Sequence, residues 1–418
     1  MVIMVLVTGT TMVGCSGSRS QKGDANTTSA EPAPATWHEK MQALSQALSR
    51  LLPLVSSRTK FNDPKNHANI DEDTRQLRSL AHSLKTGGKP NSDPTMQMMS
   101  HLFGEDLDRA REGLRGGHRE YARQILKDTT SYCIQCHTQT NNGPDFPRLA
   151  LNINTNELTS LEQAEFFAAT RQFTPALEAY ERVLADKNLA KTDPFAWEQA
   201  ARSALAIVVR VKHDPKETQA LLSKIEAHPT LPQATKRSVR AWKKSVKDWT
   251  KEPAQKLANN EQMLAKAEKL VTQAQKLQEF PLDHSQDILY FRASSLLHEI
   301  LSNPQRTPEL SAKTLYWAGV ASEATRDMNF WTLHETYYEQ CIRTLPHSKQ
   351  AQACFARLKE SVTIGYSGSS GTQIPPEVKR RLDAFEATAK SQKAAAEPAP
   401  AATPQSETAS PRGDAQAE

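Results

Sequence analysis

The sequence predicts an all-α protein, and two observations support this fold class. Glycine is scarce, with 16 residues in a chain of 418, while Ala, Leu, Gln, Glu and Lys, which favour helices, dominate. From residue 36 to about residue 388, apolar residues recur every three or four positions, which is the spacing of amphipathic helices. A chain of this length has room for two or three domains.

The first fifteen residues predict an export signal. They form a short apolar segment that is too short to span a bilayer. The segment ends in Met12-Val13-Gly14-Cys15, which resembles the bacterial lipobox and implies lipidation of Cys15. The basic residues that usually begin such a signal are absent. Either the true start of the protein lies upstream, or the signal is degenerate, or the apolar segment with its cysteine arose by chance. Residues 16–35 are polar and aperiodic, which predicts a flexible linker.

Residues 36–86 predict two helices. Thr36 and Glu39 have the spacing of a capping box, and Pro53 is expected to end the first helix. Its apolar stripe consists of Trp37, Met41, Leu44, Leu48 and Leu51. The second helix is expected to stop at Gly87-Gly88, and its stripe consists of Ile70, Leu77, Leu80, Ala81 and Leu84.

Residues 93–145 predict two further helices. The third begins at Asp93-Pro94 and ends at Gly116-Gly117, with Met99, Phe103, Leu107, Ala110 and Leu114 in its stripe. The fourth runs from about His118 to the break at Asn142-Gly143-Pro144, with Tyr121, Ile125, Thr129, Cys133 and Cys136 in its stripe. Together the four helices predict an antiparallel up-down bundle over residues 36–145.

The fourth helix contains a C-x-x-C-H motif. Cys133 and Cys136 are three residues apart, so their thiols share one helix face and can bond the two vinyl groups of one porphyrin. The adjacent His137 can then bind the iron as the proximal ligand. The frequencies of Cys and His in this chain predict only about 0.002 chance matches. No βαβ pattern supports a redox dithiol, and no second cysteine pair lies near enough for a zinc site.

A haem-binding motif at the end of the fourth helix of a bundle resembles the cytochrome c-prime type of cytochrome c. The resemblance covers residues 36–145, about a quarter of the chain. It implies one covalent haem c, attached through Cys133 and Cys136, with His137 as proximal ligand. Members of that family have either an open distal side or a methionine from the first helix, which makes Met41 the candidate sixth ligand.

Three alternatives to a Met41 ligand remain. Met41 can instead be a core residue packed over the haem, which leaves the iron five-coordinate. His82, near the end of the second helix, is a second candidate ligand. The third helix begins with Met96, Met98, Met99 and His101, which fit the lining of a haem pocket.

Residues 146–390 predict a helical repeat domain. Ala164, Phe167, Ala176, Tyr180 and Val183 have the spacing of small and aromatic residues that resembles a tetratricopeptide (TPR) hairpin. A looser match at 312–348 includes Gly319, Tyr338, Cys341 and Pro346. The resemblance implies an α-solenoid with a surface for a protein partner; the alternative is a spacer or a dimerisation surface. The basic run at 240–252 fits a docking face or a solvated helix.

Two cysteines remain after lipidation and haem attachment. Cys341 and Cys354 flank the turn at Leu345-Pro346, and a disulfide between them is the hypothesis for an oxidising compartment; buried free thiols are the alternative. Residues 365–378 predict an irregular loop, and no Gly-Lys-Ser/Thr sequence supports a phosphate-binding role. The aperiodic residues 391–418 predict a disordered tail.

These features together predict a function. The chain is expected to be a mono-haem cytochrome lipoprotein on the periplasmic side of the bacterial envelope, with the outer membrane favoured. It would transfer single electrons to a redox partner protein and is not expected to be an enzyme. With a net charge of +5 and no basic run interleaved with aromatics, no nucleic-acid partner is indicated. The alternatives are a haem-based gas or redox sensor or scaffold with five-coordinate iron, peroxide chemistry using His82 or His101, and a structural lipoprotein.

Overall fold

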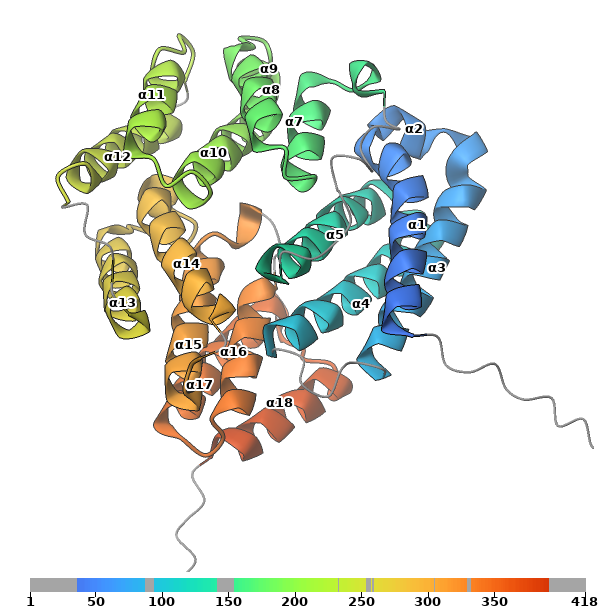
Figure 1. Ribbon diagram of the computed structural model, residues 1–418, viewed down its shortest axis with the longest axis vertical. Coiled ribbons are helices and arrows are strands. Elements are labelled where there is room, and N and C mark those ends of the chain that lie inside the picture. Colours follow the sequence, from blue (N-terminus) through green and yellow to red (C-terminus); the bar gives the residue numbers. More distant parts are fainter. Residues whose placement is uncertain are drawn as a thin grey trace, which may run out of the picture. The chain divides into compact units, whose positions relative to one another are not determined.

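The computed structural model describes residues 36–86, 94–140, 154–231, 233–252, 257, 259–303, 305–328 and 332–390 (Figure 1). Over these residues nearly all regular structure is helical, so the all-α prediction is confirmed. No described helix is both long and apolar enough to cross a membrane. The described residues from Trp37 onward belong to one compact unit.

The N-terminal part of the unit contains four long helices. They are α1 (Trp37–Ser56), α3 (His67–Thr86), α4 (Pro94–Arg115) and α5 (Arg119–Thr140), with the short α2 (Arg58–Asn62) and η1 (Pro64–Asn66) after α1. Contacts join α1 to α3, α3 to α4, α4 to α5, and α5 back to α1, so the four helices form a closed ring of neighbours.

Polar contacts fix the relative directions of three of these helices. Lys40 of α1 donates to the carbonyl of Ser83 at 3.0 Å, and Arg50 pairs with Asp73 at 2.7 Å, so α1 and α3 are antiparallel. At the other end of α1, Arg123 of α5 donates to the carbonyl of Ser56 at 3.3 Å. The start of α5 therefore lies at the end of α1.

Two sequence predictions for these helices are wrong. Pro53 lies inside α1 instead of ending it. Proline removes one backbone hydrogen bond, but Leu52 and Val55 on either side are buried, and their burial holds the last turn in helical form. Tyr121 is 54% exposed and does not belong to the buried stripe of α5, which instead begins at Ala122.

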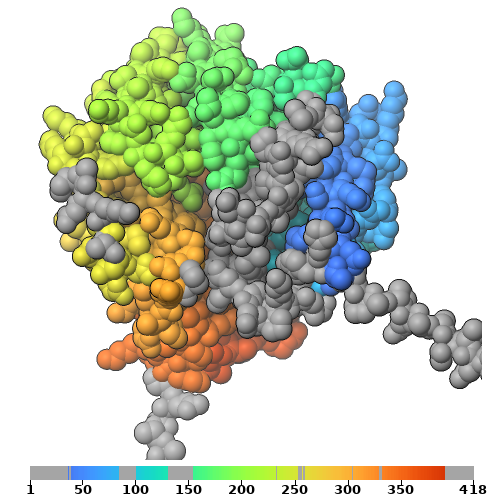
Figure 2. Space-filling model, viewed as in Figure 1, coloured from blue at the N-terminus to red at the C-terminus, as the bar shows by residue number. Residues whose placement is uncertain are grey.

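The C-terminal part begins with η2 (Thr155–Glu157) and continues as a series of helices. The first group is α7 (Ser160–Ala169), α8 (Phe173–Ala185), α9 (Leu189–Thr192), α10 (Pro194–Arg210), α11 (Pro215–Glu226) and α12 (Gln233–Trp249). The second group is α13 (Asn260–Leu277), η3 (His284–Gln286), α14 (Asp287–Ser302), α15 (Pro308–Ala324), η4 (Arg326–Met328), α16 (Leu333–Thr344), α17 (Lys349–Gly365) and α18 (Pro376–Ala389). Most consecutive helices contact each other, and the green to yellow-green segment α10–α12 is exposed on the face shown in Figure 2.

The α7–α8 hairpin illustrates how local sequence positions these helices. The side chain of Thr159 accepts from the backbone of Glu162, whose side chain accepts from the backbone of Thr159, which is a complete capping box at the start of α7. Arg171 takes a positive φ of 58° in the turn. Ala164 and Ala176 are fully buried, so the two helices approach each other closely.

Residues 365–378 contain regular structure that the sequence did not predict. Strands β1 (Ser367–Gly368) and β2 (Gly371–Thr372) pair antiparallel before α18 begins. Gly371 has a φ of 94°, which only glycine adopts without strain, and this permits the tight turn. The prediction of an irregular loop is therefore wrong in this detail.

Gly319 of α15 allows a close contact with α16. The fully buried ring of Tyr338, on α16, lies against it, and a methyl carbon built on Gly319 would lie 2.7 Å from the Cδ1 atom of that ring. We expect Gly319→Ala to lower the free energy of unfolding by about 1–3 kcal/mol through overpacking. Urea denaturation measures this change.

Gly365→Ala is the matched control for that substitution. Gly365 also lies in a helix, but nothing lies within 4 Å of a methyl carbon built on it. The control is expected to leave the unfolding midpoint unchanged or slightly raised, since alanine favours the helix. Equal midpoints for the two variants would contradict the close packing of Tyr338 on α15.

Candidate functional site

The C-x-x-C-H motif lies on one continuous helix. α5 extends from Arg119 to Thr140 and includes Cys133, Cys136 and His137. The side chains of residues 130–140 lie outside the part of the chain that the structure describes, as do Cys15, the 16–35 linker, residues 141–153 and the 391–418 tail.

The described half of α5 has one buried face. Ala122, Leu126 and Thr129 are at most 2% exposed, and they follow one another at spacings of four and three. Counting on from Thr129 by four and by three reaches positions 133 and 136. The two cysteines therefore occupy the sequence positions that continue this register.

Met41 lies one turn into α1, where it is half-buried and packs against the main apolar cluster. The contacts of Lys40 and Arg123 show that the start of α1 lies beside the end of α3, whereas the start of α5 lies beside the end of α1. Met41 is thus at the end of α1 opposite to the start of α5.

His82, the other candidate ligand, and His101, a predicted pocket residue, both have carboxylate partners. The Nε2 atom of His82 lies 3.1 Å from a carboxylate oxygen of Asp108, and the Nε2 atom of His101 lies 3.0 Å from one of Glu105. Burial raises the pKa of Glu105, but the hydrogen bond and the charge of His101 outweigh it and lower that pKa to about 2. These ion pairs hold the two imidazoles in place on α3 and α4.

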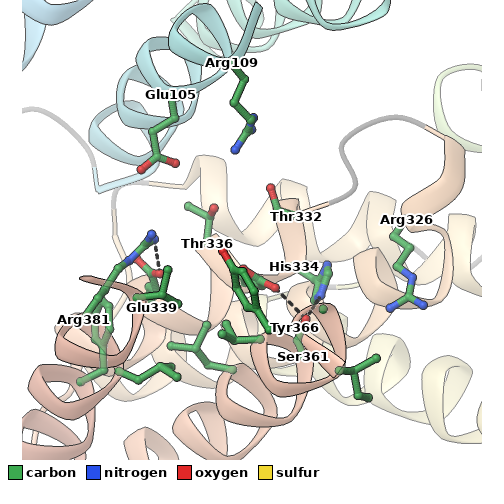
Figure 3. Close-up of a pocket in the computed structure, with 18 residues that line it drawn as sticks. Glu105, Arg109, Arg326, Thr332, His334, Thr336, Glu339, Ser361, Tyr366 and Arg381 are labelled. Atoms are coloured by element: carbon green, nitrogen blue, oxygen red, sulfur yellow. Dashed lines mark hydrogen bonds and ion pairs between the residues drawn. The ribbon is translucent and has the colours of Figure 1, made fainter. Parts of the chain in front are cut away.

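A cavity of about 560 Å³ lies between α4 and the helices α16–α18 (Figure 3). Glu105 and Arg109 of α4 face the polar side chains of α16 across it. Apolar side chains, among them Leu358, Leu382 and Phe385, form part of its wall. The cavity therefore offers both charged and apolar surface.

The polar groups of this cavity largely bind one another. Ser361 donates to a carboxylate oxygen of Glu335 at 2.8 Å, and its Oγ atom lies 2.6 Å from Nε2 of His334. In a catalytic triad the carboxylate binds the imidazole, but here it binds the hydroxyl. Glu339 forms an ion pair with Arg381, and burial raises the pKa of both Glu335 and Glu339. We interpret the set as contacts that join α16 to α17 and α18.

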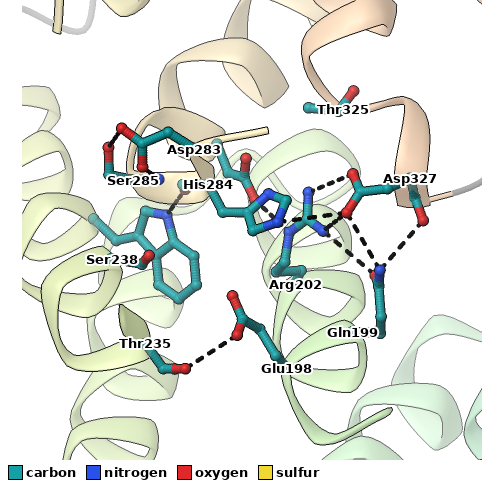
Figure 4. Close-up of polar contacts among 12 residues, drawn as sticks. Glu198, Gln199, Arg202, Thr235, Ser238, Asp283, His284, Ser285, Thr325 and Asp327 are labelled. Carbon is teal, nitrogen blue, oxygen red and sulfur yellow. Dashed lines mark hydrogen bonds and ion pairs between the residues drawn. The ribbon is translucent and has the colours of Figure 1, made fainter. Parts of the chain in front are cut away.

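A second polar cluster ties α10 to α14 and η4 (Figure 4). Arg202 is 1% exposed, and its Nε atom donates to Asp287 at 2.7 Å. Its two other nitrogens donate to the two carboxylate oxygens of Asp327 at 2.5 and 3.1 Å. Asp287 is also 1% exposed, so this charge is almost completely removed from water. No sequence motif marks these residues, which are up to 125 positions apart.

A smaller cavity of about 240 Å³ lies beside this cluster. Phe195 of α10, Arg237 of α12 and Phe280 contribute to its wall, together with Arg202 and His284. Thr235 donates to Glu198 at 3.1 Å next to it, as Figure 4 shows. The rings of Phe195 and Phe280 are exposed and contribute apolar surface beside α12.

The structure joins Cys341 of α16 to Cys354 of α17 by a disulfide, with 6.3 Å between their Cα atoms. Both residues are fully buried, and the bond joins positions 13 apart in the sequence. We expect the double variant Cys341→Ala/Cys354→Ala to lose about 3 kcal/mol of unfolding free energy, because the unfolded chain regains the freedom of the open loop.

Urea denaturation with and without reductant measures this loss. Reductant is expected to lower the midpoint of the wild-type chain and to leave that of the double variant unchanged. A wild-type midpoint that does not respond to reductant, with both thiols open to alkylation after unfolding, would contradict the bond.

Among the described residues, no group of three or more His, Cys, Asp or Glu side chains is arranged to hold a metal ion. The side chains of the C-x-x-C-H sequence are not among those that the structure describes. Comparison with protein-family models, with curated proteins and with solved structures found no match to the chain.

Proposed function

We propose that the chain is a mono-haem c-type cytochrome that transfers single electrons in the bacterial cell envelope. The observation that carries the proposal is the C-x-x-C-H sequence within one continuous helix, α5. Two thiols three residues apart on a helix, followed by an imidazole, are a donor set that fits haem c. Cys133 and Cys136 would hold the porphyrin by thioether bonds, and His137 would bind the iron. The group would supply a one-electron couple.

The contacts around α5 support a bundle as the frame of this site. α1, α3, α4 and α5 are neighbours in a closed ring, and α1 is antiparallel to α3. Helices packed in this way can enclose a cofactor between side chains of facing helices. We therefore assign residues 36–145 to a four-helix cytochrome module of the c-prime type.

The helices after residue 154 support a TPR-like module. The consecutive pairs α7–α8 and α15–α16 pack closely through Ala164, Ala176 and Gly319. Stacked helical hairpins present an extended surface for a partner protein. We propose that this module, within residues 146–390, holds or selects the redox partner.

The cysteines support the proposed compartment. A buried disulfide persists in an oxidising compartment, and haem c is attached after export. The lipobox-like sequence that ends at Cys15 would anchor the chain by lipid on the periplasmic side, with the outer membrane favoured. The proposal therefore includes both export and a membrane anchor.

Expression of the chain together with haem-maturation enzymes tests the proposal. The purified protein is expected to be red, to keep its haem under denaturing conditions, and to change its visible spectrum reversibly on reduction. A colourless protein whose Cys133 and Cys136 thiols are both open to alkylation would overturn the proposal.

Met41 is the sixth iron ligand in this proposal. The contacts of Lys40 with Ser83 and of Arg123 with Ser56 put the start of α1 at the opposite end of that helix from the start of α5, which supports this choice. We expect Met41→Leu to convert a low-spin iron into a high-spin iron that binds carbon monoxide at once, because leucine keeps the packing but has no sulfur. The visible spectrum of the reduced protein measures this.

Met263→Leu is the matched control, since Met263 is a partly buried methionine that packs against the same apolar cluster from α13. It is expected to leave the spectrum unchanged. Immediate carbon monoxide binding by the wild-type protein would instead indicate a five-coordinate iron and a gas-sensing role.

A further inference from the structure

α12 carries an unusually basic surface. Between Gln233 and Trp249 it contains six Lys and Arg residues and a single acidic residue, Asp248. Because successive residues of a helix are rotated by about 100°, all six basic residues fall within an arc of about 120°. The opposite face includes Val239, Trp242 and Val246, which are at most 1% exposed.

The buried face fixes the direction of the basic face. Trp242 is fully buried, and its Nε1 atom donates to the carbonyl of His284 at 2.7 Å. The apolar side of α12 is therefore committed to the core of the protein. The basic side must face outward, and α12 cannot insert an apolar face of its own into another surface.

Four of the six basic residues have no acidic partner among the described residues. Arg237 pairs with Glu279 at 3.3 Å, and Lys243 pairs with Glu226. The other four, Lys236, Arg240, Lys244 and Lys247, are exposed and follow one another at spacings of four, four and three, and we call them the basic stripe. Like charges four residues apart destabilise a helix, so the stripe does not stabilise α12.

Two exposed aromatic rings lie beside Arg237, in the N-terminal half of α12. Phe195 is 68% exposed and Phe280 is 47% exposed, and both line the 240 Å³ cavity together with Arg237 of α12. The guanidinium carbon of Arg237 lies 5.6 Å from the centre of the Phe280 ring. Cationic and apolar surface are thus contiguous at the N-terminal half of α12.

We propose that the basic stripe, with Phe195 and Phe280, is a contact surface for a membrane rich in anionic phospholipid. Lys and Arg attract anionic headgroups, and exposed aromatic rings enter the interface between headgroups and acyl chains. An acidic protein surface could form ion pairs with the basic stripe, but it would leave the two phenylalanines without an apolar environment. The proposal requires neither haem nor lipidation of Cys15.

Vesicle sedimentation tests the proposal. The probe is the full-length chain carrying Cys15→Ser, so that no lipid anchor contributes, mixed with vesicles of phosphatidylglycerol and phosphatidylcholine or of phosphatidylcholine alone. We expect binding to the anionic vesicles only, and we expect it to weaken as salt is added. Replacing Lys236, Arg240, Lys244 and Lys247 by Gln is expected to weaken it at least about 100-fold, since each basic residue contributes about five-fold.

A matched variant tests whether vesicle binding depends on the position of the basic residues or only on the net charge of the protein. Replacing Lys349, Lys359, Lys379 and Arg380 by Gln removes the same four charges from exposed positions on α17 and α18, and it is expected to keep most of the binding. Phe195→Ser with Phe280→Ser is expected to weaken the binding that persists at high salt. Circular dichroism checks that every variant keeps its helices.

Three results would overturn the assignment. The wild-type chain could fail to bind the anionic vesicles. The two four-residue variants could lose binding equally, which would show that only the net charge of the protein matters. Binding to soluble polyglutamate without binding to the vesicles would assign the stripe to an acidic protein instead.

Discussion

Replacing both Cys133 and Cys136 by alanine is expected to abolish covalent haem completely. In the proposed attachment each thiol would form one thioether bond to the porphyrin. Coordination by His137 alone would be reversible, so denaturation would strip any haem that remains. A haem stain of a denaturing gel, together with the mass of the intact protein, measures this loss. The variant protein should be colourless after the gel, whereas the wild-type protein should retain its colour.

The other cysteines provide the control for this experiment. Cys341→Ala with Cys354→Ala removes the disulfide of the C-terminal part but leaves the haem motif intact. This variant is expected to bind haem normally and to be less stable to urea. Covalent haem in the Cys133/Cys136 double variant would contradict the proposed attachment.

A third variant separates attachment from iron ligation. His137→Ala keeps both thiols on α5, so the haem should remain covalent while the spectrum changes because the proximal ligand is lost. If this variant had a normal spectrum, another residue would be the proximal ligand. The two experiments therefore test the two roles in the motif independently.

Helix positions were largely predictable from the sequence because their signals are local. Pro94 at the first turn of α4 and the Gly116-Gly117 pair after Arg115 mark the two ends of that helix. The capping box of α7 is likewise formed by residues three positions apart. Each of these signals acts within one or two helical turns and needs no knowledge of the rest of the fold.

Predictions failed where long-range packing outweighs a local preference. Pro53 disfavours helix, but the buried residues around it keep α1 helical through Ser56. Tyr121 is apolar enough to join the predicted stripe, yet the register that packs is that of Ala122 and Leu126. Both outcomes depend on which neighbours surround the helix, and a single sequence does not contain that information explicitly.

Some residues of the candidate sites can likewise be predicted from local sequence, and others cannot. The C-x-x-C-H motif is contiguous and chemically specific, so the sequence alone identifies it. The contact between His82 and Asp108 forms only when α3 packs against α4, whereas Glu105 lies four residues after His101 on the same helix. The cluster of Arg202, Asp287 and Asp327 has no sequence signal, because its members come from three distant segments.

Arg202→Met is expected to lower the free energy of unfolding by about 3–5 kcal/mol, because it leaves buried carboxylates without their cation. Asp287 is 1% exposed and Asp327 is 11% exposed, and Arg202 binds both of them. Without the guanidinium, two negative charges would face each other in a poorly hydrated site. Urea denaturation of the full chain measures the loss.

Two variants distinguish charge from packing as the cause. Adding Asp287→Asn and Asp327→Asn to Arg202→Met removes the stranded charges and is expected to restore more than half of the lost stability. Lys224→Met breaks the exposed ion pair with Glu181, 2.6 Å long, and should cost less than about 1 kcal/mol.

The pH dependence of Arg202→Met gives the same distinction without a further substitution. Loss of the cation raises the pKa of Asp287 and Asp327 in the folded variant above their values in the unfolded chain, because burial disfavours the charged form. A group with a raised folded pKa binds its proton more readily in the folded state, so the variant gains stability as the pH falls. The difference in free energy of unfolding between the wild-type protein and Arg202→Met should therefore become smaller at acidic pH. If this difference in free energy were the same at every pH, lost packing and not the unpaired carboxylates would explain the lower stability of the variant.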